Sequence, residues 1–139
     1  MAGKILLEVV TPDRQLLSLP VDEVIAPGSE GEFGVLPGHC HLLSTLRIGE
    51  LRYRTGDQMH YMSVLWGYAE VTPTKVTIMA EVAEKAEDID VARATAAVEQ
   101  AEQRLRIGGL PSEVKEAEIS LEKARLRKKI AQRAGRPGH

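Results

Sequence analysis

The sequence contains a single cysteine, a single tryptophan and a single phenylalanine among 139 residues. One cysteine, Cys40, cannot form an internal disulfide, which fits a reducing compartment. Aromatic residues make up only 4% of the chain, so aliphatic side chains must fill the core of any folded domain. No apolar run approaches the roughly 20 residues that span a bilayer, so we expect no direct membrane insertion. Met1–Lys4 leads straight into a strand pattern, without the apolar core and cleavage region of a signal peptide.

Sequence signatures of catalysis are also missing. Neither a GxxxxGK(S/T) phosphate loop nor a GxSxG nucleophile elbow occurs. The neighbours His39, Cys40 and His41 could suggest a metal site or a nucleophile, but a protein metal site needs three or four ligands. The other histidines, His60 and His139, form no second cluster. We therefore expect neither an enzyme nor a metal site.

The charge is unevenly distributed along the chain. The formal net charge is only −2, which gives no general reason to expect nucleic-acid binding. Residues 1–87 carry 7 Lys/Arg against 12 Asp/Glu, whereas residues 88–139 carry 11 against 8. An acidic body followed by a basic tail indicates two parts with different neighbours.

Residues 1–87 show the pattern of short strands separated by turns. Apolar, β-branched segments such as Ile5–Val10 and Met59–Leu65 alternate with turn signals such as Thr11-Pro12-Asp13. Between them, Gly31–His39 mixes Gly and Pro with apolar residues and predicts a sharp, packed corner. Short strands at close intervals predict an antiparallel β-sandwich or barrel. The alternative is an open sheet with one face covered by the tail.

Residues 88–139 change to a helical period. Val91, Ala94, Val98, Ala101 and Leu105 recur at steps of three and four, and so do Val114, Ala117, Leu121 and Ala124. Asp88 and Ser112 are the predicted N-caps, and Gly108–Pro111 separates two antiparallel helices. We predict an all-β N-terminal sandwich over residues 1–87 and a C-terminal α-helical hairpin over 88–139.

The apolar stripes of this helical hairpin are poor in large residues, since four of the nine positions are Ala and two are Leu. A buried CH₂ contributes only about 0.8 kcal/mol, so the helices are expected to depend on docking to another surface. A weakly held pair can leave one surface for another. The alternative is a hairpin fixed permanently to the sandwich.

Several segments together resemble the epsilon subunit of F-type ATP synthases. They occur in the order and spacing of that family and span nearly the whole chain. They are Gly31–His39 with Leu42-Leu43-Ser44, then Gly67-Tyr68-Ala69-Glu70-Val71, Val76-Thr77-Ile78-Met79-Ala80 and Ile89-Asp90-Val91-Ala92-Arg93-Ala94. Two positions depart from the family pattern: Trp66 stands where a small residue is usual, and Cys40-His41 replaces a small residue and Pro.

The resemblance implies a non-catalytic rotor subunit of a proton-transporting complex. Its sandwich would bind the gamma subunit and the ring of c subunits, with Glu32 and His39 facing that ring; without the resemblance both are simple turn residues. Its helical hairpin would enter the catalytic alpha/beta ring and inhibit ATP hydrolysis, or fold back and release it. The resemblance also implies a peripheral position on the cytoplasmic side of the bacterial inner membrane, or less plausibly at the plastid thylakoid.

The same resemblance implies that ATP is a regulatory ligand rather than an obligatory cofactor. The segment Ile89-Asp90-x-x-Arg93-Ala94 matches the family's ATP-binding motif, and Glu84 lies where that site adds a contact. A helix N-terminus and an arginine favour phosphate. From spacing alone, Asp90 and Arg93 indicate a surface ion pair worth about 0.2–0.5 kcal/mol, and it is the resemblance that favours a nucleotide site.

A basic run ends the second helix, and at 100° per residue its members point to nearly every side. They are Lys123, Arg125, Arg127, Lys128, Lys129 and Arg133. One interpretation is a solvated helix end that suits the helix dipole. The resemblance implies instead that these residues inhibit by facing acidic loops of the beta subunits.

Two rival functions remain open from sequence. One is a nucleic-acid-binding module that uses the basic tail, and the other is a small β-domain that binds a ligand under its helices.

Overall fold

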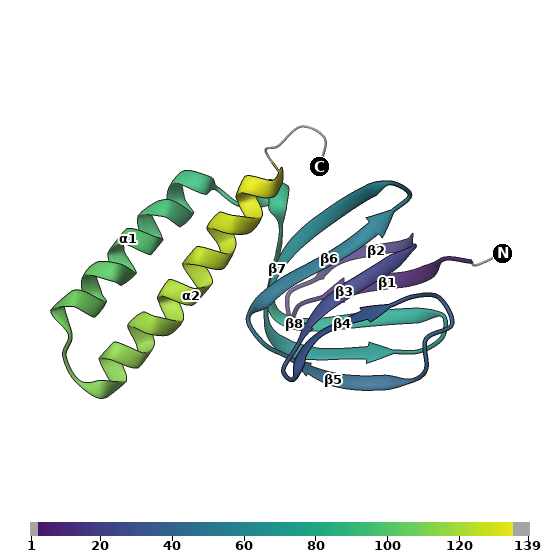
Figure 1. The fold of residues 1–139 in the computed structure, drawn as a ribbon, viewed down its shortest axis with the longest axis horizontal. Helices are drawn as coiled ribbons and strands as arrows, with labels where there is room; N and C mark the ends of the chain where they lie inside the picture. Colours follow the sequence, from purple (N-terminus) through teal and green to yellow (C-terminus); the bar gives the residue numbers. More distant parts are fainter. Residues whose placement is uncertain (1–2, 135–139) are drawn as a thin grey trace.

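The structure, a computed structural model, describes residues 3–134, so residues 135–139 of the predicted hairpin lie outside the described part. Eight strands precede one short 3₁₀ helix and two α-helices (Figure 1). The elements are β1 (Ile5–Val10), β2 (Gln15–Val21), β3 (Glu23–Gly28), β4 (Gly31–Val35), β5 (Leu42–Leu46), β6 (Gly49–Thr55), β7 (Gln58–Val71), β8 (Lys75–Lys85), η1 (Ala86–Asp88), α1 (Val91–Ile107) and α2 (Pro111–Ala134).

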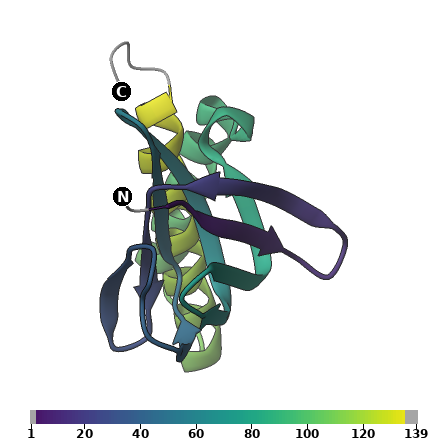
Figure 2. The same cartoon turned by 90° about the vertical axis from the view of Figure 1, so that its right-hand side faces the viewer.

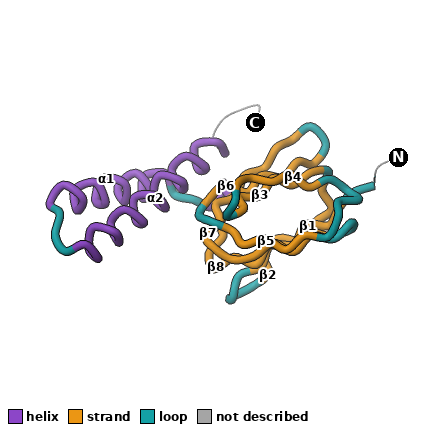
Figure 3. The backbone as a smooth tube through the Cα atoms, turned by 60° about the horizontal axis from the view of Figure 1, so that its bottom comes forward, coloured by secondary structure: helices purple, strands orange, loops and turns teal. Residues whose placement is uncertain are grey.

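The strands close around one aliphatic core, which confirms the predicted β-sandwich and excludes the open sheet. Their order is β2-β1-β8-β7-β5-β3-β4, and β6 pairs with both β3 and β7. In Figure 3, β3, β4 and β6 lie along one side of the core, and β5 and β8 along the other. Alternate residues of β1, Ile5, Leu7 and Val9, are fully buried, as the period of a half-buried strand requires.

The strands differ from the sequence prediction in three ways. Residues 58–71 form one long strand, β7, whereas the sequence predicted a strand that ends at Leu65. The pairing is antiparallel except between β1 and β8, which run parallel with Leu6 opposite Lys75. Half of the predicted corner is also regular structure, because Gly31–Val35 is β4.

Ion pairs link the first strand, β1, to the segments beside it. Lys75 of β8 lies 2.7 Å from Glu8 of β1, and its hydrogen bond lowers the pKa of that carboxyl group. Lys4 lies 2.7 Å from Asp22 and lowers the Asp22 pKa in the same way. Both carboxylates are therefore charged at neutral pH and hold β1 against its neighbours.

The helical hairpin projects from one end of the sandwich, and α2 lies between α1 and the strands (Figure 1). Seen from the sandwich end, both helices lie behind the strands (Figure 2). The hairpin confirms the predicted pair of antiparallel helices. No helix within residues 3–134 is both long and apolar enough to cross a bilayer.

Candidate functional site

The helix α2 docks on the sandwich through a small apolar cluster, here called the docking cluster. Its buried members are Ala86, Ile89, Ala94, Ile130 and Ala131, with Tyr61 and Leu126 packed against them. Ile130 is its largest fully buried side chain. Three of its five members are alanines, so its apolar contribution is limited and polar contacts matter more.

A separate cluster joins the two helices. Val98 and Ala101 of α1 pack against Leu121 and Ala124 of α2, and Leu105 is half-buried beside them. These are the stripe positions that the helical period predicted. The seam between the helices is thus distinct from the docking cluster.

The first helix begins two residues later than predicted. Asp90, not Asp88, is its N-cap, because Oδ1 of Asp90 accepts a hydrogen bond from the backbone N–H of Arg93 at 3.1 Å. Asp88 instead ends η1. The predicted cap at Ser112 is also wrong, since α2 begins at Pro111 and the Glu113 carboxylate accepts from the N–H of Leu110 at 2.9 Å.

The predicted ATP residues lie in different surroundings. Ile89 and Ala94 are buried in the docking cluster, where they position the start of α1. Asp90 is occupied as the N-cap, while the side chain of Arg93 is exposed one helical turn before Ala97. Glu84 lies on β8, across from α2.

A hollow of about 420 Å³ lies between the sandwich and the hairpin, within the range of ligand pockets. Glu84 lines it from β8, Ala97 from α1, and Lys123 and Arg127 from α2. Arg127 donates to Glu84 through Nε at 2.7 Å and Nη2 at 3.1 Å, a bidentate pair. Glu84 therefore lines the hollow, which also reaches the side of α1 near Arg93. The charges of Glu84 and Arg127, however, are already paired with each other.

The structure shows which residues of the basic run contact the sandwich, which the sequence could not show. Lys123 lies over the ring of Trp66 at 4.8 Å, and Arg127 pairs with Glu84. Arg133 pairs with Glu50 at 2.8 Å and lies over Tyr61 at 4.6 Å. We call Lys123, Arg127 and Arg133 the cationic face of α2.

The other three basic residues point elsewhere. Arg125 lies 3.4 Å from Glu102 of α1. Neither Lys128 nor Lys129 pairs with an acidic residue in the described part of the chain. Sequence reasoning missed the partners Glu50, Tyr61 and Trp66, because long-range contacts leave no local pattern.

The residue pair Trp66-Gly67 forces a distortion in β7. Both have positive φ, +47° for Trp66 and +139° for Gly67. A left-handed tryptophan is unusual and costs about 1–2 kcal/mol. Gly67 allows the backbones of β7 and β8 to approach closely. The distortion presents the Trp66 ring to Lys123.

Of the two predicted c-ring residues, Glu32 lies within β4 and His39 lies in the loop that follows it. Glu32 follows the tight turn from β3, and Arg52 donates to it at 3.0 Å. His39 lies in the loop after β4, where its Nδ1 is 2.6 Å from the Cys40 carbonyl oxygen. The neighbouring Gly38 donates to the carbonyl oxygen of Pro73.

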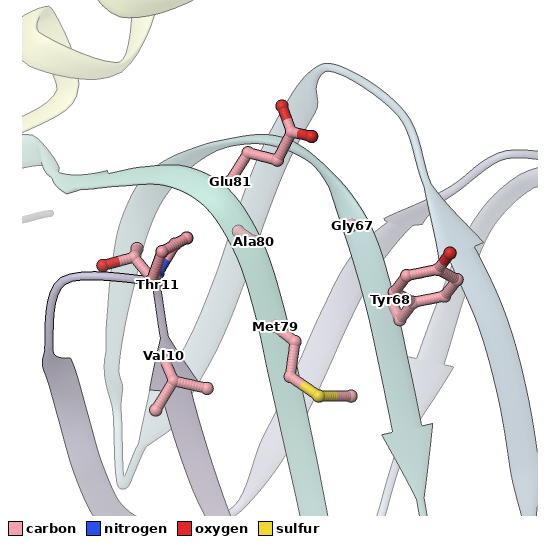
Figure 4. Close-up of a pocket in the computed structure, with 8 residues that line it drawn as sticks. Val10, Thr11, Gly67, Tyr68, Met79, Ala80 and Glu81 are labelled. Carbon is pink, nitrogen blue, oxygen red and sulfur yellow. The ribbon is translucent and has the colours of Figure 1, made fainter.

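An apolar hollow of about 320 Å³ opens on the outside of the sandwich (Figure 4). Val10 of β1, Gly67 and Tyr68 of β7, and Met79 of β8 line it. Tyr68 is 54% exposed and Met79 is 39% exposed. Exposed apolar residues gathered beside a hollow are typical of a protein-binding surface.

The fold places the chain in a class of two-part proteins, in which a β-sandwich carries a helical hairpin. The family model for the beta-sandwich domain of the ATP synthase delta/epsilon chain matches residues 4–86, and the model for its long alpha-helix domain matches residues 87–132. The chain belongs to the family of ATP synthase delta/epsilon chains.

Relatives and solved structures agree with this assignment. The chain is 51% identical to the ATP synthase epsilon chain of Syntrophobacter fumaroxidans over 133 residues, covering 96% of this chain and 99% of that one. It is 48% identical to epsilon chain 2 of Syntrophotalea carbinolica over 98% and 99% of the two chains. A chain of the Euglena gracilis mitochondrial ATP synthase OSCP/F1/c-ring structure superimposes with a TM-score of 0.80 at 26% identity, covering 96% of this chain and 82% of that one.

Proposed function

We propose that this chain is a non-catalytic rotor subunit in the central stalk of an F-type ATP synthase, joining the gamma subunit to the ring of c subunits. It would pass torque between them so that proton-driven rotation reaches the catalytic head. Its membership of the epsilon-chain family supports this role. The bacterial relatives favour the cytoplasmic side of the inner membrane, where the chain is held by its partners.

Different surfaces of the sandwich suit the two rotor partners. The apolar hollow beside Tyr68 and Met79 offers gamma a surface that water solvates poorly. Glu32 has a side chain that is 46% exposed and suits the polar loops of the c ring, with His39 as a second contact. Arg52 holds the Glu32 carboxylate in place.

The helical hairpin is proposed to regulate ATP hydrolysis by moving between this docked state and an extended state in the alpha/beta ring. The observation that carries this proposal is the separation of the docking cluster from the seam between the helices. Release from the sandwich would break contacts of the docking cluster and a few ion pairs, and it would leave the separate cluster between the two helices in place. Two arrangements of similar free energy are the requirement for such a switch.

The test is ATP hydrolysis by a catalytic head of alpha, beta and gamma subunits that lacks this chain. Full-length protein is expected to inhibit, whereas residues 1–87 are expected to bind without inhibiting, because the regulatory helices are missing. The sandwich core includes no residue beyond Ala83, so the truncated chain retains it whole. If both proteins bind and neither inhibits, the hairpin is a fixed brace. If neither binds, the rotor function itself fails.

ATP is proposed as a regulatory ligand of the docked hairpin, at Glu84, Ile89, Asp90, Arg93 and Ala94. The hollow beside Glu84 has sufficient volume, and Arg93 has an exposed guanidinium on the adjoining face of α1. Ile89 and Ala94 would act through packing and Asp90 through capping. A nucleotide bound here would contact both α1 and the sandwich and so favour the docked state.

Arg93→Ala is expected to weaken ATP binding about tenfold or more, because it removes one charge-assisted contact to phosphate. Calorimetric titration of the full-length chain measures this affinity. Arg104→Ala is the matched control, since Arg104 is an exposed arginine near the other end of α1. Equal affinities for the two variants, or no saturable binding by the parent chain, would remove ATP from the proposal.

A further inference from the structure

We infer that the interface between α2 and the sandwich holds a binding site for one water molecule, which is a structural part of the docked hairpin. The water bonds to Glu50 and Ser63 of the sandwich and to Arg133 of α2, with Arg52 as a fourth partner. The inference concerns the docked state alone, so it stands whether or not the hairpin regulates ATP hydrolysis.

The first support is a group of buried polar atoms without protein partners. Within residues 3–134, four buried side-chain atoms make no hydrogen bond to another protein atom: Oε2 of Glu50, Nε of Arg52, Oγ of Ser63 and Nε of Arg133. Nearly all buried polar groups in folded proteins bond either to protein or to ordered water. Four exceptions at one interface therefore indicate one shared partner.

These atoms come from one face of the sheet and from the helix that covers it. Ser63 lies directly opposite Glu50 in the pairing of β6 with β7, so their Cβ atoms are about 5 Å apart on the same face. Met62 and Val64 on either side of Ser63 belong to the sandwich core, so Ser63 points away from that core. Ser63 is still fully buried, because α2 packs against β7 and brings Arg133 to Glu50.

The contact between Glu50 and Arg133 has the geometry of a water-bridged pair. Nε of Arg133 and Oε2 of Glu50 lie 2.8 Å apart, but neither atom makes a hydrogen bond, so the N–H group does not point at the oxygen. Nε of Arg52 lies 3.6 Å from the other oxygen of Glu50, which is too far for a hydrogen bond. A water that accepts from the N–H groups and donates to the carboxylate supplies the missing bonds.

The charges around the site favour water over an ion. A bound anion would lie against the Glu50 carboxylate, and a bound cation would lie against two guanidinium groups, so each would meet a like charge. The site offers two N–H donors, one carboxylate oxygen and the Ser63 hydroxyl, which can accept. A neutral water, which accepts two hydrogen bonds and donates two, matches this set.

A hollow beside the site gives the water room and a path to solvent. Glu50 lines this hollow of about 200 Å³ between the sandwich and α2, together with Gly49 of β6 and with Leu126 and Lys129 of α2. A bound water needs only about 10–15 Å³ of such space and two to four polar partners. Water can therefore reach Glu50 while α2 stays docked.

The direct test is a crystal structure of the full-length chain with the hairpin docked, at a resolution that shows ordered water. The expected result is a water bonded to Oγ of Ser63, to Glu50 and to at least one of the two guanidinium groups. A direct bond from Ser63 to Glu50, to Glu84 or to a backbone carbonyl oxygen would overturn the inference. A halide or metal ion at this place, recognised by its anomalous scattering, would overturn it as well.

Ser63→Ala tests the same site in solution through the sign of its effect. If the hydroxyl bonds to the water, its loss weakens docking, and trypsin should cut the hairpin about threefold to tenfold faster. If the hydroxyl bonds to nothing, its removal relieves a buried unpaired group, and cleavage that is unchanged or slower would overturn the inference. Ser44→Ala is the matched control, since Ser44 lies in β5 opposite Ala69 and outside the docking cluster, and it should change the rate less than about twofold.

Ser63→Val decides the question if the crystals do not contain the docked hairpin. Its two methyl groups occupy the place of the hydroxyl and crowd the site, so the water should be expelled. Oxygen magnetic relaxation dispersion, which counts long-lived internal waters in solution, should find fewer in this variant than in the parent chain. Ser44→Val should leave the count unchanged. Equal counts for Ser63→Val and the parent chain would remove the water from the docked state.

Discussion

Gly67→Ala is expected to lower the free energy of unfolding of the sandwich by about 3 kcal/mol or more. A Cβ at this position would overlap the backbone oxygen of Met79 and lie 2.9 Å from the Cα of Ala80. Both atoms belong to β8, which is held by β1 on one side and β7 on the other, so they cannot move aside alone. The φ of +139° adds backbone strain for any residue with a side chain.

Urea denaturation followed by Trp66 emission and by circular dichroism measures this loss. Gly34→Ala is the matched control, because Gly34 lies in β4 with no atom within 4 Å of the added Cβ and no positive φ. The control should change stability by less than about 1 kcal/mol. A Gly67→Ala protein as stable as the control would mean that β7 and β8 separate at little cost, against the close approach described here.

Ile130→Ala is expected to weaken docking of the hairpin by about 2–4 kcal/mol while the sandwich stays folded. Ile130 is fully buried in the docking cluster, and the alanines around it cannot fill the space that it leaves. Because net docking comes from a small cluster and a few ion pairs, a loss of this size should release α2 from the sandwich. Limited proteolysis of the hairpin and Trp66 emission report that release.

Ile107→Ala removes the same atoms from a residue that is 85% exposed near the end of α1, so it is the matched control. It should change docking by less than about 0.5 kcal/mol. If both variants behave alike, the docking cluster does not hold the hairpin. The switch proposed for this chain would then need another source of stability.

The elements that could be predicted from sequence are those with a local period. In the helical stripe from Ala94 to Ala101 and in the alternation along β1, the apolar residues recur on one face of the element. The structure buries that face in both cases. The caps show the limit of this reasoning, because Asp88 and Asp90 are equally suitable residue types. Only the docking of Ile89 against the sandwich decides between them.

The candidate site was less predictable because it depends on long-range neighbours. The periodicity of the basic run could not divide Arg127, which faces the sandwich, from Arg125, which faces α1. Glu50 lies 83 positions before its partner Arg133, and nothing around it in the sequence marks it. The continuous β7 was missed for a related reason, since Trp66-Gly67 has the composition of a turn but adopts a distortion within a strand.

The parallel pairing of β1 with β8 also determines the order in which the protein can assemble during synthesis. The first strand can pair with its second neighbour only after β8 is synthesised, because Leu6 pairs with Lys75 and Val10 with Met79. Contacts this distant in sequence close late, because the intervening chain must first be ordered. The edge of β1 that faces away from β2 therefore remains unpaired on the ribosome until the eighth strand emerges. The helices, made last, can dock only on a sandwich that is already closed.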